Sequence, residues 1–322
     1  MSTYIGAPSK AESGSDMIHH QNQLISIIIP CKNHAMELRD CLNALRLSGV
    51  GTPHEIIVVD SAGSPDVAKT ISEFPKIKLI RSQSNLDAGT ARNLGVKYSS
   101  GAYLAFIDAD CIPCANWISA ALSALRQGAY MAGGPVSDIL PDHPVASADN
   151  ICQFSDLTPF RPQGLIDMLP ACNLAIRRES FDRIGGFPLA LNIEDVFFTN
   201  RVSSKWPGLC QFVPEMHVAH KGRSTLAEFW RHQYRFGHQR GFFGFRLTKT
   251  QQNIGRWRIA VPMIVLKRLI YIFQRIAAWN RNRFGWYIII SPLIVYGLIG
   301  WTMGFQLGCR RAHMIKQEVI SA

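Results

Sequence analysis

The last third of the chain has very few acidic residues. Residues 220–322 hold 17 Lys and Arg but only two acids, Glu228 and Glu318, whereas residues 1–219 hold 17 basic and 21 acidic side chains. Nucleic-acid binding would be one explanation for a net charge of +11. However, the basic region also carries long apolar runs, a combination typical of segments that lie against anionic lipid. We therefore expect anionic membrane lipid as a partner, and no nucleic acid.

The sequence also lacks a disulfide framework and a complete zinc motif. Its eight Cys are scattered, and the single C-x-x-C, Cys111 to Cys114, has no second pair to complete a zinc site. Residues 1–23 are polar and do not resemble a signal peptide, so we expect a disordered leader there. Reduced thiols of a cytosolic protein are the expected state of the cysteines, with a redox role of the C-x-x-C as the alternative.

Strand and helix patterns alternate through the first 125 or so residues. Continuous apolar runs at 24–30, 55–59, 77–80 and 102–107 are separated by segments with helical periodicity. Strands without polar alternation are typical of a parallel sheet covered by helices on both faces. The sequence therefore predicts a doubly wound α/β domain, in which ligands bind outside the carboxyl ends of the strands.

Polar side chains follow three of these strands, at the edge where a ligand is expected. They are Lys32, Asp60 and the pair Asp108 and Asp110. Two carboxylates after a buried strand can hold Mg²⁺ or Mn²⁺, which take oxygen ligands and keep part of their shell for phosphate. Arg92 lies one turn into the helix predicted over 88–98, for which Asp87 is the expected N-cap, and its forked guanidinium suits a diphosphate. The alternatives are a capped turn for the aspartates and a surface position for Arg92.

A second acidic pair, Glu194 and Asp195, opens a later helical run. Acids in a first turn often only complement the helix dipole. A carboxylate there can also act as a general base toward an attacking hydroxyl. His217 and His220 follow a predicted strand at 209–213; each could be structural, or its neutral imidazole could ligate a transition metal such as Mn²⁺.

Two apolar segments dominate the basic region. Residues 259–276 are interrupted by Lys267, Arg268 and Arg275, which predicts an amphipathic helix at a membrane interface. Residues 284–309 are 26 consecutive uncharged residues, long enough to span a bilayer. Glycines recur there every fourth residue, the spacing of closely packed helices. A buried helix of a soluble protein is the alternative, and the topology could be a span, a hairpin or an interfacial arrangement.

Several motifs in order resemble the family 2 glycosyltransferases, which have the GT-A fold. The resemblance covers residues 24–245. Its donor-side motifs are an opening strand (Ser26–Pro30), a base-binding strand (Glu55–Ser61), an Arg-Asn helix (Asn85–Gly95) and a metal motif (Asp108-Ala109-Asp110). The later motifs are an acceptor-side segment (Asn173–Phe187), an acidic pair (Glu194-Asp195) and a late histidine (His220). The expected fold is a Rossmann-like, doubly wound mixed sheet followed by a helical, membrane-associated region at 246–322.

The resemblance implies a role for each matching residue. Asp195 would be the general base, with Glu194 beside it as the second member of the catalytic pair. The remaining roles fall into three groups: nucleotide-sugar binding by Pro30, Lys32, Asp60, Arg92 and Asp108, binding of Mn²⁺ or Mg²⁺ by Asp108, Asp110 and His220, and acceptor contacts from Asn173 and Gly186.

The expected reaction is inverting transfer of a sugar, most simply from a UDP-sugar, to a hydroxyl of a lipid-linked glycan or surface polysaccharide. The basic, apolar end implies a location at the inner (plasma) membrane, with the catalytic domain facing the cytoplasm. Processive relatives carry Gln-x-x-Arg-Trp, whereas here Gln252 and Arg256-Trp257 are one residue too far apart. This departure predicts addition of one sugar per encounter.

Two other functions fit parts of the pattern. A nucleotidyltransferase shares the sheet and the acidic metal ligands, but it normally has a glycine-rich phosphate loop after the first strand. Here that loop, Pro30 to His34, contains no glycine. A non-catalytic, membrane-tethered sugar-binding protein would not need both acidic pairs.

Overall fold

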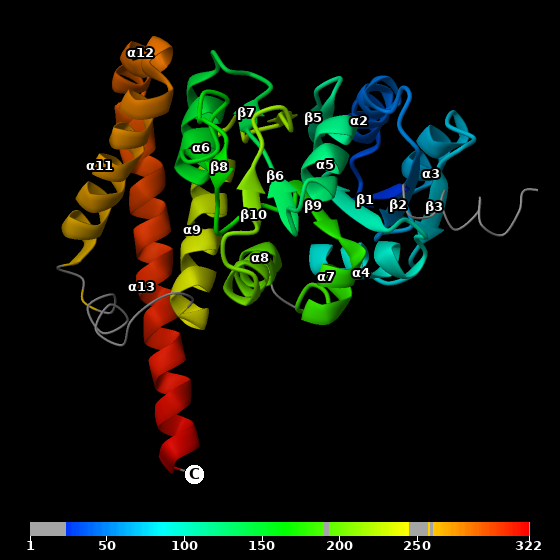
Figure 1. The fold of residues 1–322 in the computed structure, drawn as a ribbon. Coiled ribbons are helices and arrows are strands. Elements are labelled where there is room, and N and C mark those ends of the chain that lie inside the picture. Colours follow the sequence, from blue (N-terminus) through cyan, green and yellow to red (C-terminus); the bar gives the residue numbers. More distant parts are fainter. Residues whose placement is uncertain (1–23, 190–192, 245–256, 258–259, 322) are drawn as a thin grey trace, which may run out of the picture.

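The computed structural model describes residues 24–189, 193–244, 257 and 260–321 (Figure 1). The predicted leader and the Gln252 and Arg256 of the imperfect motif lie outside the described residues. An α/β part is built on a mixed sheet, and a group of long helices stands beside it at one edge of the molecule (Figure 1). The predicted combination of a doubly wound mixed sheet with a C-terminal helical region is confirmed.

The central sheet has eight strands in the order β3-β2-β1-β4-β9-β6-β10-β8. The first four strands in sequence are parallel to one another, whereas β9 runs antiparallel to both of its neighbours. The strands are β1 (Ile25–Cys31), β2 (His54–Asp60), β3 (Lys78–Arg81), β4 (Tyr103–Ile107), β6 (Met131–Gly133), β8 (Gly164–Leu165), β9 (Asn173–Arg177) and β10 (Cys210–Phe212).

Helices cover both faces of this sheet, as the unbroken apolar strands require. Ile27, Ile28 and Ile29 of β1 are all fully buried, so successive side chains pack on opposite faces. Figure 1 shows α2, α3 and α5 on one side and α4, α7 and α8 on the other. These helices are α2 (Ala35–Ser48), α3 (Pro65–Ser72), α4 (Ala88–Lys97), α5 (Trp117–Arg126), α7 (Arg178–Ile184) and α8 (Glu194–Lys205).

Helix α4 lies closest to the ligand edge and begins where the sequence predicted. Asp87 caps it by accepting a hydrogen bond from the Thr90 amide at 2.9 Å. A side chain on Gly95 would overlap Ile28, so this glycine lets the helix approach β1 and β2 closely. The close approach fixes the position of Arg92 relative to the carboxyl ends of the strands.

A second sheet of three short strands stands beside the carboxyl end of β4. Its order is β5-β11-β7, formed by Cys111–Pro113, Val218–His220 and Val136–Asp138. Strand β11 is antiparallel to β5 and pairs His220 with Cys111. Residues more than a hundred positions apart in the chain are thereby brought together next to Asp110.

The helical part is joined to the α/β part through a glycine-lined contact between α9 (Leu226–Phe243) and α13 (Ser291–Ser321). A Cβ on Gly304 or Gly308 of α13 would overlap a backbone carbonyl of α9, and a Cβ on Gly237 or Gly241 of α9 would overlap one of α13. The glycine repeat therefore marks close helix packing, as predicted, and its partner is a helix of the same chain.

The predicted uncharged span at 284–309 is two helices rather than one. Helix α12 ends at Ile289, and α13 begins at Ser291 with Pro292 in its first turn, where the missing amide proton costs no hydrogen bond. Among the described residues, α13 from Ser291 to Met314 is the helix long and apolar enough to cross a membrane. More than half of that stretch, 56%, is covered by the rest of the protein.

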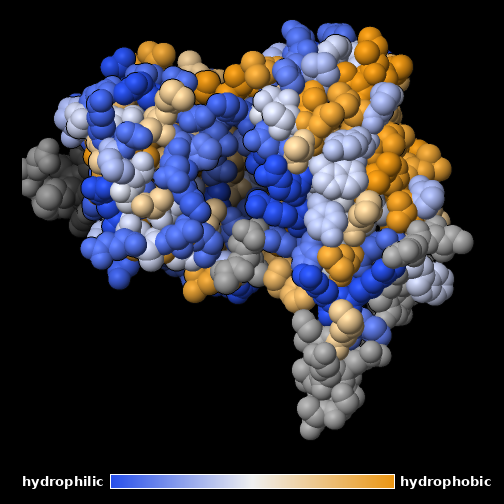
Figure 2. All heavy atoms as spheres, turned by 180° about the vertical axis from the view of Figure 1, so that it is seen from behind, coloured by the Kyte–Doolittle hydropathy of each residue, from blue (hydrophilic) through white to orange (hydrophobic). Residues whose placement is uncertain are grey.

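The outer surface of the helical part is apolar. Helix α11 (Val261–Trp279) buries Val265, Ile272 and Ile276 against the neighbouring helices, whereas Met263, Leu266 and Ile270 are exposed. In α12 (Phe284–Ile289), Ile288 and Ile289 are exposed as well. Figure 2 shows hydrophobic residues gathered on this side of the molecule and hydrophilic ones over the α/β part. We call this surface the α11–α12 face.

Candidate active site

A pocket of about 220 Å³ lies at the carboxyl ends of β1 and β4, against the first turns of α4. This is the edge of the sheet at which the sequence predicted a ligand. Five predicted site residues line the pocket together, namely Pro30, Lys32, Arg92, Asp108 and Asp110. We call it the donor pocket.

Asp60 ends β2 next to this pocket and is completely buried. Its Oδ1 accepts a hydrogen bond from the Ala62 amide at 3.2 Å, while Oδ2 accepts none from the described residues. Arg81 Nε lies 3.7 Å from that oxygen. A buried carboxylate oxygen without a hydrogen bond is uncommon, and it offers an acceptor for an N–H of a ligand.

Arg92 connects the two acidic pairs. Its Nη2 donates to Asp108 Oδ1 at 2.6 Å, and its Nη1 donates to Glu194 Oε1 at 2.7 Å. Burial alone would lower the pKa of Arg92, but the charges of Asp108 and Glu194 outweigh it and raise the pKa. Because both terminal nitrogens bind protein carboxylates, a diphosphate would reach this guanidinium only in competition with them. The structure thus gives Arg92 a joining position that the sequence did not predict.

The pair Glu194 and Asp195 forms the first turn of α8, which begins at Glu194. Burial, followed by the charge of Asp195, raises the pKa of Glu194 to about 7. Burial also raises the pKa of Asp195, although Asp195 accepts hydrogen bonds from the Val196 amide at 2.7 Å and the Ala171 amide at 3.3 Å. Raised carboxyl pKa values move both groups toward the range in which a carboxylate can accept a proton near neutral pH.

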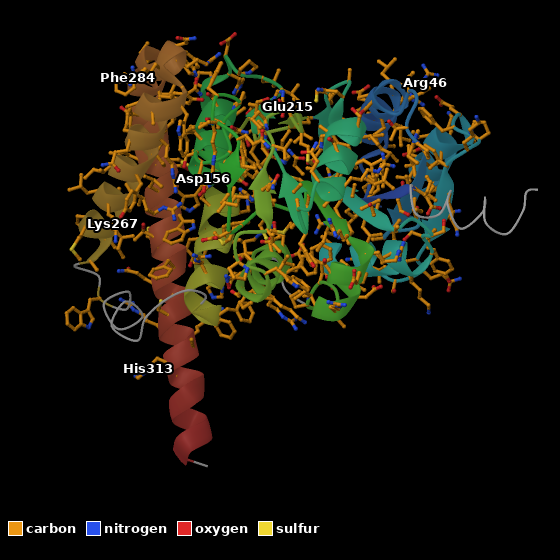
Figure 3. The ribbon with its side chains drawn as sticks, viewed as in Figure 1. Arg46, Asp156, Glu215, Lys267, Phe284 and His313 are labelled. Carbon is orange, nitrogen blue, oxygen red and sulfur yellow. The ribbon has the colours of Figure 1, made fainter. Side chains whose placement is uncertain are left out.

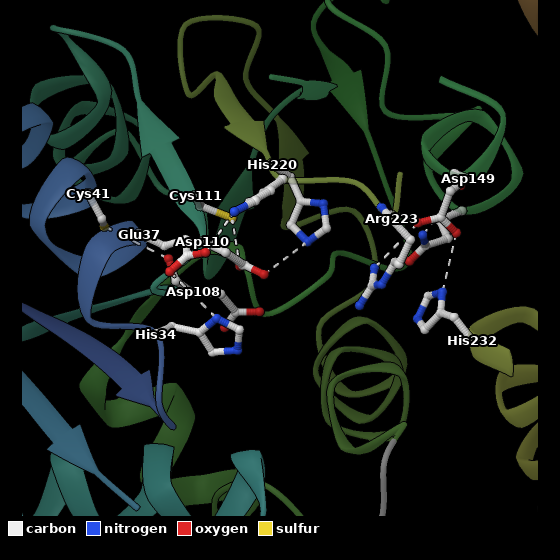
Figure 4. A network of polar contacts seen from close by, with 12 residues as sticks. His34, Glu37, Cys41, Asp108, Asp110, Cys111, Asp149, His220, Arg223 and His232 are labelled. Carbon is white, nitrogen blue, oxygen red and sulfur yellow. Dashed lines mark hydrogen bonds and ion pairs between the residues drawn. The ribbon is translucent and has the colours of Figure 1, made fainter. Parts of the chain in front are cut away.

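A cluster of possible metal ligands stands at the mouth of the donor pocket. One ligand atom each from Asp110, Cys111 and His220 lies within 4.8 Å of the others, and His220 Nε2 is 3.8 Å from Asp110 Oδ2 (Figure 4). Burial raises the pKa of the Cys111 thiol well above its usual range, so this thiol is uncharged when no cation is bound beside it. The Asp110 carboxylate and the His220 imidazole are a donor set that fits Mn²⁺ better than Mg²⁺.

Asp108, also predicted to hold the metal, lies outside that cluster of described residues. One of its oxygens is instead engaged by Arg92. The structure thus brings Asp110 and His220 together, as the predicted metal set requires, and it places Asp108 between the metal cluster and the acidic pair.

The two residues predicted on the acceptor side occupy the interior instead. Asn173 is fully buried, donates to the carbonyls of Pro135 and Met216, and accepts from Trp117 Nε1. The side-chain nitrogen of Asn173 is thus held by two loop carbonyls and its oxygen by α5, while its predicted role on the acceptor side stays a prediction. Gly186 is also buried; its φ of +76° places it in the left-handed region, where a Cβ would overlap Asn93.

A polar network beside the metal cluster is a feature that no pattern in the sequence indicates. Asp149, fully buried in α6 (Pro144–Phe154), accepts from Gln233 and from the Arg223 amide, and it contacts His232 at 3.3 Å (Figure 4). His232 and Gln233 belong to α9. The network therefore ties α9 to α6 and to the loop after His220, and no motif around Asp149 in the sequence could reveal it.

The fold identifies the class of protein. The structure of a mannosyltransferase from Pyrobaculum calidifontis, described in complex with GDP-Man and Mn²⁺, superposes with a TM-score of 0.56 at 14% sequence identity. The match covers 87% of this chain and 86% of that one. A mixed sheet with its pocket at the carboxyl ends of parallel strands is thus the GT-A fold.

The sequence comparisons give the family. The sequence model described as "Glycosyl transferase family 2" matches residues 26–185. Glycosyltransferase AglE of Haloferax volcanii is 28% identical over 220 residues, which cover 66% of this chain and 71% of that protein. An Escherichia coli enzyme, UDP-Glc:alpha-D-GlcNAc-diphosphoundecaprenol beta-1,3-glucosyltransferase WfgD, is 31% identical over 32% of this chain and 41% of its own length. The chain is a member of the family 2 glycosyltransferases and is therefore an enzyme. This membership argues against a nucleotidyltransferase and against a non-catalytic sugar-binding protein.

Proposed function

We propose that this enzyme transfers a sugar, with inversion, from a nucleoside diphosphate sugar to a hydroxyl of a lipid-linked glycan or surface polysaccharide. The observation that carries the proposal is the Arg92 bridge, which joins Asp108 in the donor pocket to Glu194 beside the acceptor side. A donor in the pocket and a base on α8 are thereby held at a fixed separation, and fixed geometry is a main source of rate enhancement in group transfer.

The donor would place its base near Asp60 and its diphosphate near Asp108 and Asp110. Pro30 and Lys32 line the same pocket, and the Lys32 charge favours an anionic ligand. Asp110 and His220 would hold Mn²⁺ or Mg²⁺, which supplies Lewis-acid stabilisation of charge on the leaving diphosphate when bound. Asp60, with its unsatisfied oxygen, supports recognition of a base that carries an N–H, as uracil does.

Asp195 would be the general base. Asp195 is less buried than Glu194. Among the described residues, Glu194 makes an ion pair with Arg92 and Asp195 makes none. Asp195 would take the proton of the acceptor hydroxyl as that oxygen attacks the anomeric carbon on the face opposite the diphosphate. Glu194 would act by positioning Arg92.

Membrane association of the helical part is a further element of the proposal. Support comes from the exposed apolar α11–α12 face and from the basic charge of the C-terminal region, which together suit an anionic membrane surface. Helix α13 packs against α9, a helix with several Arg and His residues, so the α11–α12 face is the better membrane contact. Nucleotide sugars are cytosolic, which places the donor pocket at the cytoplasmic side of the plasma membrane.

A donor screen tests this function. Purified full-length protein with Mn²⁺ should release the nucleoside diphosphate from one nucleotide sugar, most simply a UDP-sugar, and chelation with EDTA should abolish the release. Nuclear magnetic resonance of the product should show the anomeric configuration inverted. Turnover that continues in EDTA would contradict the metal site, and retained configuration would contradict the role of Asp195.

A further inference from the structure

A second and larger cavity, of about 700 Å³, lies between the α/β part and the helical part. Residues of α8, α9, α11 and α13 line it, together with the end of α6 and the residues that follow it. Asp156, after α6, and Lys267, on α11, are among them (Figure 3). The donor pocket and this cavity share no lining residue, and nothing in the reaction at the donor pocket uses it.

The described lining of this cavity is strongly basic. It contains four cations, Arg240, Lys267, Arg268 and Arg275, and one acid, Asp156. Arg275 lies 3.7 Å from that acid, which leaves an excess of positive charge. Side chains of like charge repel one another in a partly buried space, and an anionic ligand relieves that repulsion.

Arg268 is the centre of this cluster. Its guanidinium stacks on the ring of Trp301 at 3.9 Å from the centroid, and its buried Nε donates no hydrogen bond to the described residues. Burial, with smaller contributions from the charges of Arg240 and Arg275, lowers the pKa of Arg268 to about 10. A buried guanidinium with a free donor is costly to maintain unless something else satisfies it.

The same cavity also has apolar walls that continue to the outside. Ile264, Ile272 and Phe305 line its interior. Met263 and Tyr271 also line it, and they are 58% and 50% exposed to solvent. Met263 and Tyr271 adjoin the exposed side chains of the α11–α12 face. An apolar chain that enters the cavity from this face passes Lys267, whose ammonium lies 5.8 Å from the centre of the Tyr271 ring.

The inner end of the cavity reaches the proposed base. Ile193 and Val196, which flank Glu194 and Asp195 in sequence, are lining residues, and so is Met168. Asp195 itself accepts a hydrogen bond from Ala171, three residues beyond Met168. A ligand in the cavity thus lies beside the start of α8, next to the acidic pair.

We propose that this cavity binds the acceptor as a lipid phosphate or diphosphate, with the phosphates on Arg268 and its neighbouring cations and the apolar chain along α11. This inference rests on the proposed glycosyltransfer and names the class of its acceptor. The phosphate would anchor the acceptor by charge-assisted hydrogen bonds, which are stronger than neutral ones, while the sugar attached to it extends toward Asp195.

Binding of farnesyl diphosphate to the purified full-length protein tests the proposal. Saturating UDP and Mn²⁺ are present throughout, so that the diphosphate cannot occupy the donor pocket. Farnesol and inorganic pyrophosphate supply the apolar and the anionic halves alone. The variants are Arg268→Gln, Arg275→Gln and, as a control that removes an exposed charge outside the cavity, Arg281→Gln.

Farnesyl diphosphate should bind wild type and Arg281→Gln equally, and each cavity variant should bind about tenfold or more weakly, the loss expected for one charged hydrogen bond. Farnesol and pyrophosphate should each bind much more weakly than farnesyl diphosphate. Equal affinity of pyrophosphate would overturn the lipid assignment, and unchanged affinity of both cavity variants would overturn the cavity.

Release of nucleoside diphosphate, measured on the same preparations, separates this inference from the function on which it rests. The circular dichroism spectra of the Arg268 and Arg275 variants should match the spectrum of wild type, which shows that the variants are folded. If wild type hydrolyses a nucleotide sugar but does not bind farnesyl diphosphate, the acceptor inference fails alone. If wild type hydrolyses no nucleotide sugar, the proposed function fails first.

Discussion

At the scale of single residues, the site is organised by one buried cation between two carboxylates. Arg92 is 3% exposed, and it contacts Asp108 on one side and Glu194 on the other. Removal of either carboxylate would leave a buried charge only partly compensated, which is strongly destabilising in proteins. This arrangement explains why two acids so far apart in the sequence keep a constant geometry.

The acidic pair predicts a pH dependence of activity. The pKa values of Glu194, at about 7, and of Asp195 are raised above their ordinary values of 4.5 and 3.8. A base must be ionised, so kcat/KM should be low in acid and rise as the pH passes through the raised pKa values. The midpoint of this rise in kcat/KM belongs to the pair of Glu194 and Asp195 rather than to either residue alone.

The pH profile of kcat/KM, measured at saturating Mn²⁺, checks this expectation. Its acid limb should have its midpoint above 4.5, the ordinary value for Glu194. Donor affinity measured in parallel should identify any titration that belongs to binding alone. A limb centred near the ordinary pKa of an aspartate would show that the base is not in this buried pair.

At the scale of secondary structure elements, the contact between α9 and α13 holds the two parts of the molecule together. The glycines of each helix lie against backbone atoms of the other helix. A methyl group added at such a glycine would overlap backbone atoms, and a change of side-chain rotamer could not remove the overlap. The polar network of Asp149 fixes the start of α9 against α6. These contacts position the walls of the lipid-phosphate cavity.

Substitution of Gly304 by Ala should therefore destabilise the protein. The new Cβ would overlap the Tyr234 carbonyl, and overpacking of this kind costs roughly 1–3 kcal/mol. Alanine otherwise favours a helix by about 1 kcal/mol over glycine, so helix propensity predicts the opposite sign. Equilibrium unfolding in urea, followed by circular dichroism, distinguishes the two effects.

The matched control is Gly285→Ala in α12, because nothing lies within 4 Å of a Cβ at that position. This variant should be as stable as wild type or slightly more stable. If Gly304→Ala behaves like the control, the close contact between α9 and α13 does not exist in solution.

Elements defined by local patterns could be predicted from the sequence, whereas contacts between distant segments could not. The buried strands and the capped start of α4 at Asp87 follow from periodicity and a single capping residue, and both are confirmed. The burial of Asn173 could not be predicted, because it depends on the carbonyls of Pro135 and Met216. The division of residues 284–309 into two helices could not be predicted either, because composition does not indicate the break at Ile290.

The same distinction applies to the candidate site. Asp108 and Asp110 could be placed at the sheet edge because they directly follow β4. The approach of His220 to Asp110 depends on the antiparallel pairing of β5 with β11, and the large basic cavity depends on how α11 and α13 pack. Neither is encoded in any short stretch of sequence.

At the scale of the whole molecule, hydrophilic and apolar surface are separated between the two parts. Figure 2 shows the hydrophilic α/β part on one side and the apolar α11–α12 face on the other. The donor pocket lies in the first part, and the lipid-phosphate cavity lies between the two. A water-soluble donor and a membrane-bound acceptor would thus approach the acidic pair from opposite sides.

This arrangement predicts that the α11–α12 face binds membranes. The double variant Leu266→Gln and Ile270→Gln removes two exposed apolar side chains from the face. Its partitioning onto vesicles with anionic phosphatidylglycerol should fall by about tenfold or more, given roughly 1 kcal/mol for each partly buried side chain. Co-sedimentation with vesicles measures the change.

Leu47→Gln is the control, because Leu47 is 65% exposed but lies on α2, at the other end of the molecule (Figure 1). It should partition like wild type. Equal partitioning of the double variant and the control would mean that another surface, such as α13, carries membrane binding.

The central claim is that Asp195 activates the acceptor at a site that also holds a nucleotide sugar. The most direct test is Asp195→Asn, assayed for sugar transfer and for donor binding on the same preparation, with Asp182→Asn on α7 as an exposed control. We predict that Asp195→Asn binds the donor as wild type does and loses transfer by at least about 10²-fold, the contribution of a general base. Transfer at the wild-type rate by this variant would contradict the account.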